Sequence, residues 1–160
     1  FSTETYLRIT DSGAGELDST TRYASASLSA ALPEAEIRTV RTAIEDRTVS
    51  TLAAFADGVD VVPVFRGPDG TISEIHGVTH HLEGPNGERI GMSMAEAGVT
   101  RDSCRVGRNL WRGMAVCPAR GASNVTLVFA IPGYRGPFDA LPPAEDLRRA
   151  ELQRIIWRAG

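Results

Sequence analysis

The sequence predicts a single α+β domain, mainly an antiparallel β-meander with two or three short helices. Three observations lead to this class. The chain has 160 residues, of which 42% are hydrophobic and 23% charged, so we expect residues 1–160 to form one globular domain. Two turn signals in the middle of the chain each lie between β-branched segments. The helix signals are few and short.

The N-terminal segment predicts a strand and then a helix. Residues 5–9 favour a short strand, and the turn residues at 11–15 end it. Three competent N-cap residues at 18–20 precede a segment with apolar residues at near-helical spacing up to Leu32. Pro33 is expected to end this helix.

The middle of the chain predicts the meander. β-branched residues favour a strand over residues 35–44, and the acidic residues Glu45 and Asp46 are expected in a solvated turn after it. Gly-Pro-Asp-Gly at 67–70 and Gly-Pro-Asn-Gly at 84–87 are typical of tight β-turns. The strands that these turns join are residues 61–65, 71–75, 78–82 and 88–90.

The C-terminal part predicts three more strands and a short helix. A capping box within residues 93–98, with Ser followed three residues later by Glu, predicts one helical turn. Residues 111–116 and 125–131 are expected to be strands, the second of them central because it is almost continuously apolar. A Pro-Pro pair opens a short helix within residues 142–149, and residues 152–158 predict the last strand.

The composition excludes several classes of enzyme. All 17 basic residues are Arg, so the chain lacks the Lys that P-loop proteins, pyridoxal phosphate enzymes and kinases require. On a strand, His76 and His80 would stand about 13 Å apart, and His81 would point to the opposite face. We therefore expect no metal site and no cofactor.

The charge is distributed unevenly. The net charge is -3, which argues against nucleic acid as a partner. Residues 1–100 hold 7 Arg and 15 acidic residues, whereas residues 101–160 hold 10 Arg and 5 acidic residues. The predicted interaction surface lies in the basic part and consists of Arg101, Arg105, Arg108, Trp111 and Arg112. It is suited to a phosphate, a lipid headgroup or an acidic partner, although a solvated Arg-rich loop is the alternative.

The two cysteines, Cys104 and Cys117, suit neither a four-Cys zinc site nor a redox motif. A disulfide between them is the simplest interpretation, and two separate buried thiols in a cytosolic protein are the alternative. The chain contains no apolar run long enough to span a membrane.

Four groups of residues, taken in order and spacing, resemble the sigma-E-regulated envelope lipoproteins of proteobacteria, a family of unknown function. They are Gly13-x-Gly15-x-Leu17-Asp18-x-x-Thr21-x-Tyr23, the 87–98 segment, the two cysteines with Trp111-x-Gly113 between them, and the C-terminal Gly136-Pro137, Leu141-Pro142-Pro143 and Ile155-Ile156-Trp157-Arg158. The segment from Arg47 to Gly58 departs from the family pattern.

The resemblance implies export to the periplasm and anchoring to the outer membrane by a lipidated Cys upstream of Phe1. An oxidising compartment favours the disulfide. We therefore expect a non-catalytic periplasmic lipoprotein domain that binds a protein or an anionic envelope component during surface stress. The resemblance supplies no catalytic residue. A small hydrolase acting on an envelope polymer is the alternative function.

Overall fold

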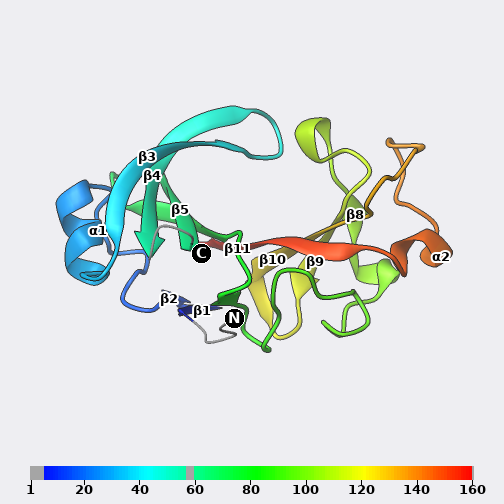
Figure 1. The fold of residues 1–160 in the computed structure, drawn as a ribbon, viewed down its shortest axis with the longest axis horizontal. Helices are drawn as coiled ribbons and strands as arrows, with labels where there is room; N and C mark the ends of the chain where they lie inside the picture. The colour runs from blue at the N-terminus through cyan, green and yellow to red at the C-terminus, as the bar shows by residue number, and fades with distance from the viewer. Residues whose placement is uncertain (1–5, 57–59, 160) are drawn as a thin grey trace.

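The computed structural model describes residues 6–56 and 60–159, which form two β-sheets with short helices around them (Figure 1). The larger sheet has eight strands in the order β3-β4-β5-β6-β11-β10-β9-β8, and the smaller has the order β2-β1-β7. The strands are β1 (Leu7–Thr10), β2 (Gly13–Ala14), β3 (Glu36–Ala43), β4 (Thr48–Ala56), β5 (Asp60–Arg66), β6 (Ile72–Gly77), β7 (Leu82–Glu83), β8 (Arg105–Val106), β9 (Ala115–Ala119), β10 (Ala122–Ala130) and β11 (Glu151–Arg158). The helices are α1 (Ser25–Ala31), α2 (Ala144–Leu147) and two 3₁₀-helices, η1 (Arg101–Ser103) and η2 (Asn109–Trp111).

The eight-stranded sheet consists of two antiparallel runs. Strands β3 to β6 form one run and β8 to β11 the other, and β6 pairs with β11 to join them. The predicted antiparallel meander is therefore confirmed in its main feature. With two α-helices among the described residues, the structure is mainly β.

Three sequence predictions are corrected. Strand β4 was not predicted, although it pairs with both β3 and β5. The predicted turn at residues 84–87 is present, since the Gly84 N–H donates to the Glu88 carbonyl. The predicted hairpin strands beside it are reduced to one bridge, between Glu83 and Arg89, because β7 pairs in parallel with β1. The strand expected at residues 111–116 begins later, at Ala115, because Gly113 takes a φ of +79° that breaks the extended backbone.

The helix signals have mixed outcomes. Helix α1 ends before Pro33 as predicted, but its N-cap is Ala24 without a side-chain hydrogen bond. The carboxylate of Asp18 accepts hydrogen bonds from Thr20 in a turn before the helix instead. The capping box is confirmed, since the backbone N–H of Glu96 donates to Ser93 Oγ and that of Ser93 donates to the Glu96 carboxylate. The residue predicted at the start of the first strand, Thr5, lies outside the described residues.

Two hydrophobic clusters lie on opposite faces of the eight-stranded sheet. The larger one contains residues of both sheets and of α1 and α2, and its largest side chains include Trp157, Phe129 and Ile155. The smaller one consists of Trp111, Val116, Val128 and Ile156, with Met114 packed against it. We call the sheet face that carries the smaller cluster the hairpin face, because the end of the β3–β4 hairpin contacts it. No helix in the described part of the chain is long and apolar enough to cross a membrane.

Candidate interaction surface

The predicted disulfide is present. The Sγ atoms of Cys104 and Cys117 are 2.09 Å apart, which excludes two separate thiols. Cys117 is in β9 and is 1% exposed, whereas Cys104 is half-buried and directly follows η1. The bond therefore ties the segment of residues 101–112, which we call the Arg loop, to the eight-stranded sheet.

A second attachment of the Arg loop comes from the tip of the β3–β4 hairpin. Glu45 lies in the turn closed by the Ile44 N–H and the Arg47 carbonyl. Its carboxylate accepts two hydrogen bonds from the Arg105 guanidinium, at 2.6 and 2.7 Å, and one from the Arg108 backbone N–H at 2.8 Å. The Leu110 N–H donates to the Glu45 carbonyl at 3.0 Å. In Figure 1 the cyan hairpin tip accordingly lies beside the yellow-green loop.

These contacts change the interpretation of Glu45 and Asp46. The sequence predicted a solvated turn, and a turn is present, but the Glu45 side chain is only 12% exposed. The Arg105 hydrogen bonds lower the pKa of Glu45 although burial acts in the opposite direction. The neighbouring Asp46 carboxylate accepts a hydrogen bond from the Asn109 side chain at 2.8 Å. The hairpin tip therefore supports the Arg loop.

The five residues of the predicted interaction surface have different environments. Arg105 is paired with Glu45, and Arg101 donates to the carbonyls of Leu141 and Pro142. Trp111 is buried in the smaller hydrophobic cluster. These three side chains hold the loop in place. Arg108 and Arg112 are exposed.

The two exposed arginines line a cavity of about 440 Å³. Its lining consists of Val106, Gly107, Arg108, Asn109, Arg112, Phe138 and Asp139. The Arg112 guanidinium lies 5.4 Å from the centre of the Phe138 ring. Leu110 and Phe138, at 49% and 37%, are the exposed large hydrophobic residues of the described chain. We call the group Arg108, Asn109, Leu110, Arg112 and Phe138 the loop surface. The sequence did not predict three of its members, Asn109, Leu110 and Phe138, and Phe138 is also distant in the chain.

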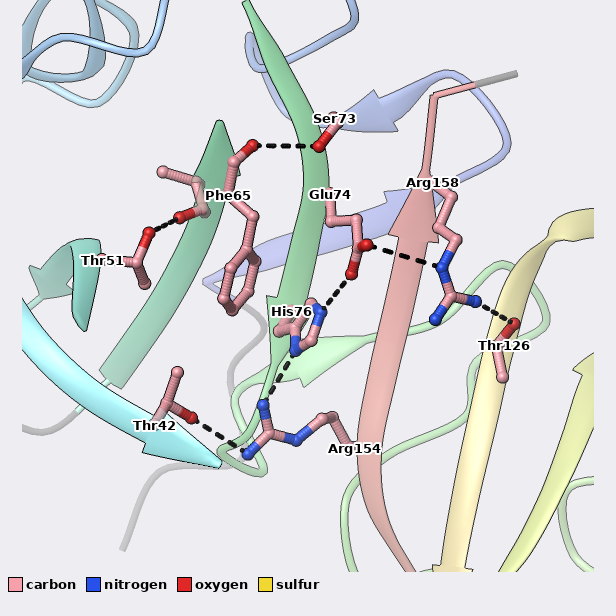
Figure 2. A network of polar contacts seen from close by, with 10 residues as sticks. Thr42, Thr51, Phe65, Ser73, Glu74, His76, Thr126, Arg154 and Arg158 are labelled. Atoms are coloured by element: carbon pink, nitrogen blue, oxygen red, sulfur yellow. Dashed lines mark hydrogen bonds and ion pairs between the residues drawn. The ribbon is translucent and has the colours of Figure 1, made fainter. Parts of the chain in front are cut away.

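A polar cluster occupies the hairpin face between β6 and β11 (Figure 2). His76 Nε2 is 2.9 Å from Glu74 Oε1, and His76 Nδ1 is 2.8 Å from Arg154 Nη1. The second Glu74 oxygen is 3.7 Å from Arg158 Nε. Arg154 Nη2 also donates to Thr42 Oγ1 at 3.2 Å, which links the cluster to β3.

The cluster fixes the protonation of His76. Because a guanidinium can only donate, His76 Nδ1 must accept from Arg154, and the proton must be on Nε2, which donates to Glu74. His76 is 1% exposed, and this burial lowers its pKa to about 4 despite the hydrogen bond to Glu74. The imidazole is therefore neutral at pH 7.

The three histidines do not come together. His80 and His81 are in edge-to-face contact with each other, whereas His76 packs against Phe65. Within residues 6–56 and 60–159, no group of three or more His, Cys, Asp or Glu side chains is arranged to hold a metal ion.

Comparisons with known proteins identify relatives without a known activity. A family model described as a protein of unknown function, DUF1131, matches residues 1–159. The structure is similar to the crystal structure of the uncharacterized protein yfeY from Escherichia coli, with a TM-score of 0.73 and 23% sequence identity. That match covers 94% of this chain and 99% of the other, and at this identity it concerns the fold alone. The chain matches none of the curated proteins compared with it.

Proposed function

The chain belongs to the DUF1131 family, whose members are proteins of unknown function, and from this premise we propose that it is a non-catalytic binding domain of the cell envelope. Its loop surface binds a phosphate or carboxylate group of an envelope component or envelope protein. The domain is anchored to the outer membrane through a lipidated Cys upstream of Phe1 and acts in the sigma-E response to surface stress. The resemblance to sigma-E-regulated lipoproteins supports both the lipid anchor and the role in surface stress.

The observation that carries the proposal is the pair of arginines in the 440 Å³ cavity. Neither Arg108 nor Arg112 forms an ion pair with a carboxylate in the described part of the chain, and Asp139 is the one acidic residue of the lining. Guanidinium groups suit phosphate and carboxylate because they donate hydrogen bonds in a planar fork. The exposed Phe138 ring adds an apolar contact beside them, a combination enriched at recognition sites.

The attachment of the loop supports the same function. The disulfide on one side and the Glu45 contacts on the other hold the backbone from Cys104 to Leu110. A site held in its binding conformation loses less conformational entropy when the ligand binds. The disulfide also supports an extracytoplasmic location, since such bonds persist in oxidising compartments.

We expect Arg108→Ser combined with Arg112→Ser to abolish binding while leaving the fold intact. Each charge-assisted hydrogen bond lost is worth about 1.5–3 kcal/mol, so capture should fall at least about tenfold. The measurement is photo-crosslinking in the bacterial host, with benzoylphenylalanine replacing the aromatic ring of Phe138 in the full-length protein. A crosslinked product is expected with the unsubstituted arginines and not with the double variant.

The matched control is Arg41→Ser with Arg120→Ser, which removes the same charge from two exposed positions outside the loop surface. The control should keep the crosslinked product. If the Arg108/Arg112 variant gave the same product in the same yield, or if the reference protein gave none, the loop surface would not be the binding site.

The hydrolase acting on an envelope polymer stays a prediction. In the described structure the buried His76 hydrogen bonds to the Glu74 carboxylate and the Arg154 guanidinium. Contact with a histidine does not activate either of these two groups as a nucleophile. No observation in the described residues favours this second function over binding.

A further inference from the structure

A second cavity, of about 340 Å³, lies on the hairpin face. Its lining consists of Ala43, Val78, Leu110, Trp111, Met114, Val128, Gln153 and Arg154. From this lining we infer that the cavity binds a small carboxylate with an apolar body, and that Arg154 is the residue that recognises the carboxylate. Leu110 of the loop surface also lines this cavity, whereas Arg108 and Arg112 do not.

The first argument is the charge balance around Arg154. Its guanidinium donates to two uncharged acceptors, His76 Nδ1 and Thr42 Oγ1. In the described part of the chain no carboxylate pairs with it, because Glu74 is paired with Arg158 and bonded to His76. The cluster of Glu74, Arg154 and Arg158 therefore carries one positive charge in excess. A half-buried cation without a paired anion favours an anionic ligand.

The second argument is the apolar character of the remaining lining. Leu110, Trp111, Met114, Val128 and Val78 contribute hydrophobic side chains, and the Trp111 ring centre is 5.7 Å from the Arg154 guanidinium. Pockets that combine such a lining with one or two polar groups are typical of small-molecule sites.

A carboxylate fits this site better than a phosphate. Two N–H groups of Arg154 are already engaged with His76 and Thr42, so only part of the guanidinium faces a ligand. A carboxylate brings one negative charge, which the single excess positive charge balances. A phosphate monoester carries close to two negative charges at neutral pH and would leave one of them unpaired.

The test is a titration of the full protein with sodium octanoate, followed by NMR of the Trp111 Nε1–H and Arg154 Nε–H resonances. Octanoate combines one carboxylate with an apolar chain, and octanamide is its uncharged counterpart of equal size. We expect saturable shifts with octanoate and at least about tenfold weaker binding of octanamide. Equal affinity for the two, or no saturable shift with octanoate, would overturn the inference.

Three variants complete the test. Arg154→Gln should weaken octanoate binding at least about tenfold. This change also removes a hydrogen-bond partner of His76, so a second variant is needed. Val78→Phe fills the cavity and leaves the contacts of Arg154 in place, and it should also weaken octanoate binding. Arg108→Ser with Arg112→Ser should bind octanoate like the reference protein. Octanoate binding that survives both cavity variants, or displacement of octanoate by equimolar inorganic phosphate, contradicts the assignment.

Discussion

Removal of the Cys104–Cys117 disulfide is expected to lower the free energy of unfolding by about 3 kcal/mol. The two residues are 13 positions apart, and the chain-entropy model gives about this value for closing a loop of that size in the unfolded state. The bond also joins the Arg loop to a buried position of β9, so its loss should release the loop locally as well.

Urea unfolding of the oxidised protein, the reduced protein and the Cys104→Ala/Cys117→Ala variant measures this effect. Alanine is chosen because serine would place an unpaired hydroxyl at the buried Cys117 position. A reducing agent should leave the double variant unchanged, which controls for effects on the rest of the chain. Equal unfolding free energies for oxidised and reduced protein would show that the disulfide contributes nothing to stability.

Acidification is expected to destabilise the protein through His76 before most carboxylates titrate. The pKa of His76 is about 4 in the folded protein, against about 6.5 in the unfolded chain. Between these values the unfolded state binds more protons, so stability is lost as the pH falls from about 6.5 to about 4. The difference between the two pKa values corresponds to a loss of about 3 kcal/mol in the free energy of unfolding.

His76→Gln isolates this contribution, because glutamine can still donate to Glu74 and accept from Arg154 but does not titrate. The free energy of unfolding, measured by urea denaturation between pH 7 and pH 4.5, should fall less steeply in this variant than in the reference protein. His80→Gln, the same change at an exposed position, is the matched control for the substitution itself. The same slope in all three proteins would mean that His76 is not held neutral.

The sequence predicts the elements whose signals are local. The turn at residues 67–70 and the two strands beside it are present, and so are the Ser93 capping box and the last strand. Strand β4 was not predicted because it lies between β3 and β5 and is specified by pairing rather than by a turn signal of its own. The parallel pairing of β7 with β1 was missed for the same reason, since it joins segments about 75 residues apart.

The functional residues, like the strands, could be predicted where the signal is local and not where it depends on long-range contacts. The concentration of Arg in residues 101–112 is visible in the sequence, but the partner of Arg105 is Glu45, 60 residues earlier. The polar cluster depends on the register that places His76 opposite Ile156, which no local pattern contains. The available signal was that Glu74 and His76 lie two residues apart in β6 and Arg154 and Arg158 four apart in β11. This spacing places each pair on one face of its strand but does not show that the two pairs meet.

We expect the Glu45 contacts to hold the Arg loop in the conformation that presents the loop surface. Amide hydrogen exchange at Arg108 tests it most directly, because this N–H donates to the Glu45 carboxylate. We expect slow exchange in the reference protein and in Asp46→Ala, and exchange close to the rate of an unprotected amide in Glu45→Ala. Fast exchange at Arg108 in the reference protein, or unchanged protection in Glu45→Ala, would show that the Glu45 contacts do not hold the loop.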